Sequence, residues 1–309
     1  MTIFSDSEIE SFIRNGFVTL RNAFPRDVAI ECREILWSIL KHERNIIKED
    51  PETWTEERVG LKNIFRNSDG PPWSKVFTER LLTAIDELLG GRSKWSPEAL
   101  GCGWWVINFP MKLEPPWGAC GNWHVDGSFF KHKVDSKEQG LLPIFLFNDI
   151  LPESGGTALA VGSHMQVAQL LYENPQGLSV GEITRSILQN QGILDNIFEV
   201  TGRGGDVVLT HPFLLHARSK NLGVNGVNSV RFICNPCIAL KNKLNVHENS
   251  GGDGNTANVE EGSKQEHSPV EKAIIESKSR CLIPLSFGKR KSPQTNLRAN
   301  SKHRRQRRR

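Results

Sequence analysis

The chain has 309 residues, of which 38% are hydrophobic, and its formal net charge is +4. This length accommodates one large domain with appendages, and the apolar content is sufficient for a buried core. No apolar run approaches the roughly 20 residues of a membrane span, and residues 1–6 lack the pattern of a secretory leader. We therefore expect a protein of the cytosol or nucleus that makes no membrane contact.

The first ninety residues predict helices around one early strand. Ser5 and Glu8 form a capping-box pattern before a short helix that Gly16 ends, and a strand follows at Phe17–Leu20. Pro25 opens a longer helix, and residues 73–89 repeat the amphipathic pattern. The apolar positions of the longer helix are Val28, Ile35, Leu36, Ile39 and Leu40. We interpret these helices as a buttress for a barrel, rather than as a binding groove.

Short strand-like runs follow through the middle of the chain. They span residues 104–109, 141–147, 157–161, 207–210 and 230–234. Many short strands with Gly and Pro turns favour a jelly roll over a parallel α/β sheet. Helices are expected at Met165–Tyr172 and Glu182–Gln189, in an insertion that could wall a substrate pocket. The predicted fold class is mainly β with flanking helices.

The triplet His124-Val125-Asp126 has metal-ligand character. In an extended strand, residues two apart project to the same side, so His124 and Asp126 can hold one ion while Val125 points away. Gly127 follows at once, which would end the strand at the mouth of a barrel. The triplet alone favours a simpler interpretation, a surface histidine beside an aspartate in a turn.

A second histidine completes the set further along the chain. A Gly-Gly-Asp turn at 204–206 leads into an apolar run that ends in His211 and His216. These two are five residues apart and would face opposite sides of a regular strand, so at most one binds the metal, and His216 is the better candidate. Two imidazoles and one carboxylate can cap one face of a ferrous ion, Fe(2+), and leave the opposite positions free.

Arg231 is a lone cation inside the apolar run Val230–Cys234. Considered alone, it is equally compatible with an exposed arginine on an edge strand. A buried arginine needs an anion, and a planar guanidinium suits the distal carboxylate of a dicarboxylic acid. His211 and Asn221 are candidates for orienting His216.

Aromatic residues near the triplet either line an apolar pocket or pack in the core, which is their more frequent role. They are Trp104, Trp105, Trp123, Phe129 and Phe130. The six cysteines are scattered, with a single Cys-x-x-Cys at 234–237. One such pair is weak support for zinc, so free thiols in a reducing compartment are expected.

The C-terminal part divides into three predicted segments. Residues 241–266 are rich in Asn, Gly, Ser, Glu and Lys and read as a flexible polar linker or loop. Residues 267–279 predict a short helix that returns to the domain, because Ser268, Pro269 and Glu271 form a helix start. Residues 280–309 predict a basic, disordered tail.

The chain is strongly basic at its end. Residues 278–309 contain twelve Lys and Arg and no acidic residue, so the rest of the chain carries a net charge of −8. Two basic clusters of this kind are typical of a nuclear import signal, with weak, salt-sensitive nucleic-acid contact as a side effect. A solvated tail without function is the simpler alternative. The chain does not end in Ser-Lys-Leu, the peroxisomal signal.

Four motifs in order resemble the phytanoyl-CoA dioxygenase family of Fe(II)- and 2-oxoglutarate-dependent oxygenases. They cover roughly residues 8–240 and lie at 15–24, 123–127, 153–164 and 205–216. The resemblance implies that residues 1–240 form a double-stranded β-helix, of the jelly-roll or cupin type, with an N-terminal helical buttress. It also implies Fe(II) on His124, Asp126 and His216, and 2-oxoglutarate on Arg231. The stretch between His216 and Arg231 is longer than in the usual pattern, which makes Arg218 the substitute for Arg231.

The expected reaction hydroxylates a C–H bond of a small-molecule substrate with O₂ and releases succinate and CO₂. A hydroxyl from Thr157 or Ser229 could assist Arg231 in binding 2-oxoglutarate. Asp126 as third ligand leaves no position for chloride, so hydroxylation is favoured over halogenation. Two alternatives remain open: a nuclear oxygenase acting on a nucleic acid or protein recruited by the basic tail, and a non-catalytic, cupin-like metal-binding protein.

Overall fold

A computed structural model describes most of the chain. The described residues are 2–62, 69–97, 100–101, 104–111, 113–223, 229–246 and 266–279. The tail predicted at 280–309 and most of the predicted linker lie outside this part. No helix within the described ranges is long and apolar enough to cross a membrane.

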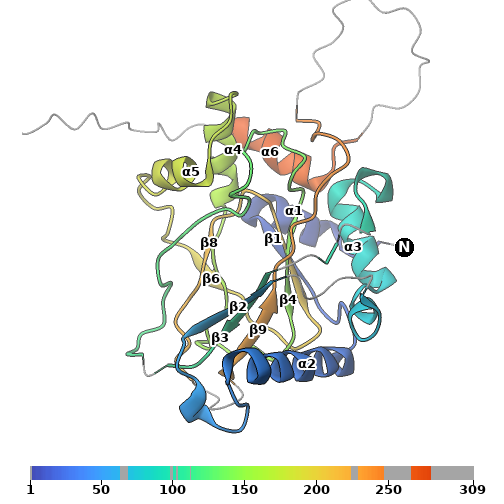
Figure 1. Cartoon of the computed structure of the whole chain (residues 1–309). Helices are drawn as coiled ribbons and strands as arrows, with labels where there is room; N and C mark the ends of the chain where they lie inside the picture. The colour runs from blue at the N-terminus through green and yellow to red at the C-terminus, as the bar shows by residue number, and fades with distance from the viewer. Residues whose placement is uncertain are drawn as a thin grey trace, which may run out of the picture.

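The strands form two antiparallel sheets (Figure 1). The larger has the order β1-β7-β4-β9-β3-β2 and the smaller has the order β6-β5-β8. The larger contains β1 (Phe17–Leu20), β2 (Arg58–Lys62), β3 (Trp104–Asn108), β4 (Leu142–Leu146), β7 (Val207–Thr210) and β9 (Arg231–Cys234). The smaller contains β5 (Ala158–Ala160), β6 (Ile197–Glu199) and β8 (His216–Ala217). This architecture confirms the predicted mainly β jelly roll; the sequence pattern missed β2, β6 and β8.

Alternation along the strands divides the apolar residues between two layers. Ile144, Val208 and Ile233 of the larger sheet belong to a cluster that also contains Leu159 of β5 and Leu214, so this cluster fills the space between the sheets. Neighbours of opposite parity, such as Phe145 and Phe232, belong to the larger core beneath the helices. A side chain with the parity of Ile233 therefore faces the interior between the sheets.

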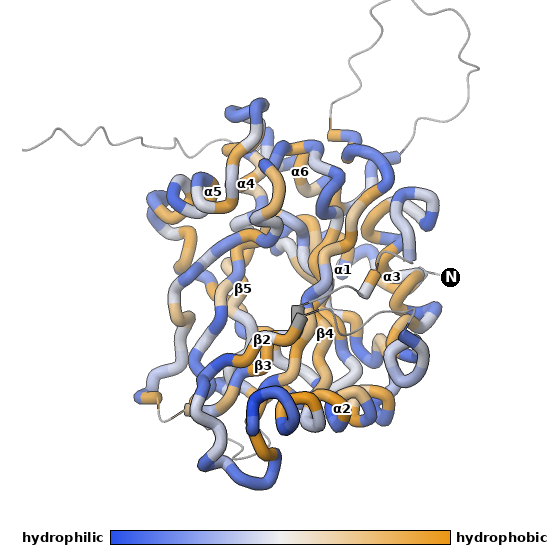
Figure 2. Tube along the Cα trace, viewed as in Figure 1, coloured by the Kyte–Doolittle hydropathy of each residue, from blue (hydrophilic) through white to orange (hydrophobic). Residues whose placement is uncertain are grey.

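The helices cover the outside of this sandwich. They are α1 (Asp6–Asn15), α2 (Arg26–Arg44), α3 (Glu79–Leu89), α4 (Ser163–Glu173), α5 (Val180–Ile187) and α6 (Pro269–Ser279), with 3₁₀ turns at Pro51–Thr53, Trp73–Val76 and Arg92–Lys94. In Figure 2 the hydropathy of α2 alternates along the helix, as expected for a helix with one buried face. Trp37 of α2 packs edge-on against Phe232 of β9, with ring centroids 5.1 Å apart.

Two helix predictions needed correction. Residues 73–89 are not one helix: a 3₁₀ turn ends at Val76, and α3 begins after Thr78, whose side chain accepts from the Leu81 backbone N–H. On α2, Ile35 is 36% exposed, and Cys32 is buried instead. The apolar spacing alone does not distinguish one long helix from a 3₁₀ turn followed by a helix that a threonine caps. It also does not fix which residues at the border of the apolar face of α2 are buried.

The N-terminal capping box is confirmed, because the Ser5 side chain accepts from the Glu8 backbone and Glu8 from that of Ser5. The helix expected after Ser268 is α6, which packs against α1, α3 and α4. Within residues 241–246, where the predicted linker or loop begins, residues 241–243 are exposed, whereas Leu244 and Val246 are buried and the Val246 carbonyl accepts from the Tyr172 hydroxyl at 3.0 Å. Apolar residues within a polar stretch explain this difference.

Candidate metal centre

A backbone bridge places His124 beside His216. The two residues exchange both backbone hydrogen bonds, each 3.0 Å from N to O. His216 begins β8, which pairs with β5 through Leu159 opposite His216. The side chains therefore lie next to each other, with ring centroids 4.4 Å apart, although 92 positions separate them in the sequence.

The segment holding Asp126 is not the strand that the sequence predicts. His124 forms a single isolated bridge, and the chain bends at Asp126. Gly127 then adopts φ +100°, and a Cβ there would collide with the Phe130 ring. The bend still directs the Asp126 carboxylate toward the imidazoles. His124 and Asp126 therefore share one site because the chain bends at Asp126, and not because of their alternation along a strand.

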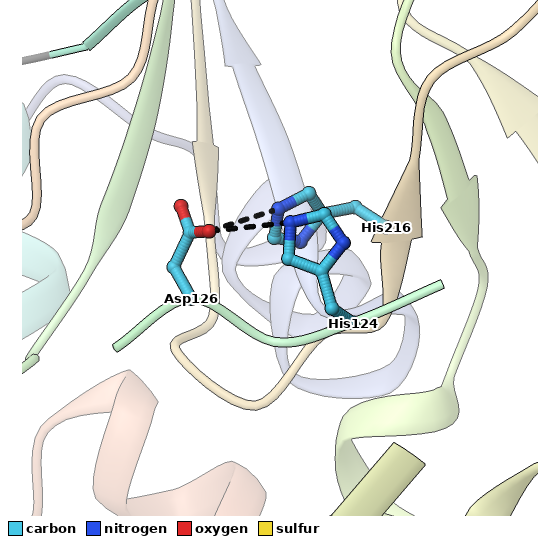
Figure 3. Close-up of side chains that lie close together, drawn as sticks. All are labelled: His124, Asp126 and His216. Carbon is cyan, nitrogen blue, oxygen red and sulfur yellow. Dashed lines mark ion pairs between the residues drawn. The ribbon is translucent and has the colours of Figure 1, made fainter. Parts of the chain in front are cut away.

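Three ligand atoms converge on one point (Figure 3). The Nε2 atoms of His124 and His216 lie 3.4 Å and 3.6 Å from Asp126 Oδ1. Candidate ligand atoms of the three residues all lie within 4.8 Å of one another, and this is the one such His, Cys and acidic cluster found in the described ranges. The three side chains predicted from the sequence as metal ligands therefore lie together in the fold.

Backbone carbonyls set the tautomer of both imidazoles. The Nδ1 atom of His124 lies 2.7 Å from the Asn122 carbonyl, and that of His216 lies 3.1 Å from the Leu214 carbonyl. Because a carbonyl only accepts, each Nδ1 carries the proton and each Nε2 presents its lone pair. The His216 Nε2 is buried and has no hydrogen-bond partner in the protein. Two free nitrogen lone pairs beside a carboxylate fit a divalent ion such as Fe(II).

The charges of the site favour the same ion. Burial alone would raise the pKa of Asp126, but the adjacent His216 and His124 hold it below its usual range, so the carboxylate is ionised at neutral pH. Burial lowers the pKa of His124, but the Asp126 carboxylate and the hydrogen bond to the Asn122 carbonyl together raise it by more. A carboxylate facing two imidazole nitrogens is therefore a negative, oxygen- and nitrogen-donating site.

The three ligands open into a cavity of about 770 Å³. Its wall combines the ligands with cationic and apolar side chains, which include Arg58, Val106, Phe129, Lys137, Ile144, Thr157, Arg218, Arg231, Ile233 and Asn235. Such a volume is within the usual range for small-molecule sites. A cavity of this volume could accommodate a dicarboxylic acid together with a second small molecule.

Arg231 is a buried cation in this cavity. It is 2% exposed, on an interior strand between β4 and β3, so the edge-strand alternative is wrong. Burial, together with the charge of Arg58, lowers the pKa of Arg231 to about 10, which leaves it protonated at neutral pH. The Nη1 atom of Arg231 donates to the Gly155 carbonyl, while its Nε atom is buried without a hydrogen-bond partner. An anion in the cavity would satisfy the remaining donors.

The carbonyl that contacts Arg231 belongs to a clamped loop. The Glu199 carboxylate accepts from the backbone N–H of Glu153 at 2.8 Å and of Gly156 at 3.1 Å. Gly155 lies between these two anchor points. Glu199 of β6 therefore holds the loop that orients the Arg231 guanidinium, a role that is not predicted from the sequence.

The other predicted co-substrate residues separate into two groups. Arg218 lines the cavity but already pairs with Glu57, at 2.9 Å. Thr157 is buried and also lines the cavity. Ser229 is absent from the cavity wall as described, and its carbonyl accepts from Asn221 Nδ2 at 2.6 Å. The structure thus brings Arg231 and Thr157 to one wall and leaves Ser229 outside it.

Neither proposed orienting residue contacts His216. His211 Nδ1 accepts from the Phe213 backbone, and its ring packs against His164, with centroids 4.9 Å apart. Asn221 Nδ2 donates to the Asn108 and Ser229 carbonyls. The orienting contact comes from the Leu214 carbonyl, which sequence pattern cannot reveal because every residue has one.

Burial of His211 predicts acid sensitivity. Burial, and then the neighbouring His164, hold its pKa well below the usual 6.5, so the native ring stays neutral. Below about pH 6.5 the unfolded chain binds a proton that the native state does not, and the free energy of unfolding falls by up to about 1.4 kcal/mol per pH unit. The free energy of unfolding, measured with urea between pH 5 and 8, should change less steeply with pH for His211→Gln than for the unsubstituted protein. An equally steep pH dependence in both proteins would contradict this role of His211.

Among the aromatic residues considered for the pocket, Phe129 lines the cavity, and it is 76% exposed. Trp105 and Trp123 are buried in the core. Asn235 also lines the cavity and was missed by the sequence analysis. It has the parity of Arg231 and Ile233 on β9, so alternation continued beyond the strand could have identified it.

Comparison with solved structures supports the fold. SnoK, a non-haem alpha-ketoglutarate-dependent carbocyclase from nogalamycin biosynthesis, matches with a TM-score of 0.51 and 16% identity, over 78% of this chain and 86% of SnoK. EctD from S. alaskensis with bound Fe matches with a TM-score of 0.48 and 17% identity, over 77% of each chain. HygX from Streptomyces hygroscopicus with nickel and 2-oxoglutarate matches with a TM-score of 0.45 and 13% identity, over 75% of this chain and 85% of HygX.

At these identities, the likeness to SnoK shows that the two chains share a fold, and nothing more. No known family profile matches the sequence, and no curated protein matches it significantly. The chain therefore shares the fold of SnoK, with a cluster of three potential metal ligands inside it.

Proposed function

We propose that this protein is an Fe(II)- and 2-oxoglutarate-dependent dioxygenase that hydroxylates a C–H bond of a small molecule. One observation carries the proposal: the His124, Asp126 and His216 ligand atoms converge in the same cavity as the buried Arg231. A metal site alone has many uses. A metal site beside a buried, incompletely satisfied guanidinium suits a co-substrate with one chelating end and one distal carboxylate.

The reaction assigns a task to each group of residues. Bound Fe(II) would supply the activation of O₂, while the three ligands hold the ion on one face. Arg231 binds the distal carboxylate of 2-oxoglutarate and fixes its direction, with the Thr157 hydroxyl on the same wall. One oxygen atom of O₂ enters succinate as CO₂ leaves, and the other replaces hydrogen on the substrate as a hydroxyl. Phe129 presents an apolar surface to the substrate.

The finer family assignment, to phytanoyl-CoA dioxygenases, rests on the four ordered motifs between residues 15 and 216. A small-molecule substrate agrees with the cavity volume. Among proteins of comparable fold, HygX has been solved with hygromycin B and EctD with 5-hydroxyectoine. Nucleic-acid contact has no support beyond the basic tail, so we propose a metabolite rather than a macromolecule as substrate.

The test of function is succinate formation. Purified protein with Fe(II), 2-oxoglutarate and O₂ should release succinate, and pooled metabolite fractions should raise the rate when they contain the substrate. Untargeted comparison of metabolites from cells with and without the gene then identifies the molecule. Tight metal binding without succinate formation in any fraction would support the alternative of a non-catalytic, cupin-like protein.

We propose a separate role for the tail at 280–309, which lies beyond the described residues. Its two basic clusters support nuclear import, because Lys289-Arg290-Lys291 and residues 304–309 are spaced by polar sequence. Deleting residues 285–309 should leave succinate release unchanged and disperse a fluorescently tagged protein from the nucleus. Lost turnover with unchanged location would instead place the tail at the active site.

A further inference from the structure

One amide group contacts the metal-binding carboxylate from the side opposite the histidines. Asn235 Nδ2 donates to Asp126 Oδ2 at 3.1 Å, whereas Oδ1 of the same carboxylate faces the two imidazole nitrogens. An ionised carboxylate only accepts hydrogen bonds, so the amide nitrogen must be the atom that faces it. The two oxygens of Asp126 therefore have different partners.

The position of Asn235 is constrained by the fold. It directly follows β9, and it lines the same cavity as Arg231 and Ile233. Its Oδ1 atom is buried without a hydrogen-bond partner. The amide thus gives its hydrogen bond to Asp126 while its own oxygen stays unsatisfied, which is unfavourable for a buried polar atom.

We propose that Asn235 is a positioning residue that restricts Asp126 to binding the metal through one oxygen. This inference rests on the proposed function. An octahedral ion held by three protein atoms has three positions left, of which the keto acid of 2-oxoglutarate needs two and O₂ needs one. A carboxylate bound through both oxygens would occupy one of these. By holding Oδ2, Asn235 keeps all three positions open.

The test separates this role from metal binding and from direct contact with 2-oxoglutarate. Mn(II), which does not start turnover, is the metal probe, and oxalate is a chelating probe that lacks the distal carboxylate chain. Binding of Mn(II), then of oxalate or 2-oxoglutarate to the Mn(II)-saturated protein, is measured by calorimetry. The variants are Asn235→Leu, which keeps the branched shape but not the donor, and Asn235→Ala.

We expect both variants to bind oxalate and 2-oxoglutarate at least about tenfold more weakly, and by similar factors, because the chelating group would lose a coordination position to Asp126, with a smaller change for Mn(II). The matched control is Asn190→Ala, which removes a comparable amide hydrogen bond, to Gln166 at 2.9 Å, outside the cavity wall. Unchanged oxalate binding, or a loss confined to 2-oxoglutarate, would overturn the inference. If the unsubstituted protein itself fails to bind Mn(II), the proposed function fails with it. If a variant loses Mn(II) as strongly as oxalate, Asn235 only supports the ligand and the inference is wrong.

Discussion

Replacing His216 with Ala is expected to abolish metal binding and succinate formation while the protein stays folded. The side chain supplies a buried Nε2 with no protein partner, and its backbone bridge to His124 does not depend on the imidazole. Loss of a ligand should weaken binding by more than about 100-fold, because even groups that only support ligands contribute 10- to 100-fold. Mn(II) titration and succinate release measure the two effects.

The matched control is His211→Gln. His211 is also a buried histidine, five positions earlier, but it packs against His164 and contacts none of the three ligands in the described structure. This variant should bind Mn(II) as the unsubstituted protein does. Circular dichroism confirms that each variant is folded. Full turnover by a folded His216→Ala protein would contradict the assignment of this histidine.

Replacing Arg231 with Met should raise the KM for 2-oxoglutarate steeply. The guanidinium is buried in the cavity, and its Nε has no hydrogen-bond partner in the protein, so its pairing with a carboxylate is largely removed from water. Losing one partner of such a pair costs about 2–5 kcal/mol, which corresponds to about 30-fold to several thousand-fold. Initial rates of succinate release at varied 2-oxoglutarate concentration provide the value.

Two further variants identify which arginine acts. Arg218→Met should change the KM far less, because Arg218 lines the cavity already paired with Glu57. Arg231→Lys keeps the charge but loses the planar fork, so an intermediate KM is expected, and this variant also controls for misfolding of the methionine variant. A large effect of Arg218→Met, with little effect of Arg231→Met, would move the role to Arg218.

The cluster of three candidate ligands could be predicted because it depends on residue type and order. His124, Asp126 and His216 stand in a recurring order of two histidines and one carboxylate, and the apolar run around Arg231 marked a candidate buried cation but left an exposed edge-strand position equally open. The same reasoning failed for the local structure of Asp126. A bend that Gly127 permits depends on the packing of Phe130, which lies outside any pattern of alternation.

The supporting contacts were beyond the reach of sequence reasoning. Leu214 acts through its carbonyl, which carries no side-chain signal, and Glu199 acts on a loop more than forty positions earlier in the chain. His211 was a candidate for orienting His216 because it is close to it in the sequence, but in the fold its ring packs against His164. Tertiary geometry decides these roles, and local sequence does not encode it.

The most direct test of the account is calorimetric binding of 2-oxoglutarate to the unsubstituted protein, with and without one equivalent of Mn(II). We propose that one metal ion, held by His124, Asp126 and His216, creates the co-substrate site together with Arg231. We expect one 2-oxoglutarate per chain, bound at least about tenfold more tightly with the metal, since chelation adds metal–oxygen bonds to the Arg231 pair. Equal affinity with and without Mn(II) would contradict it.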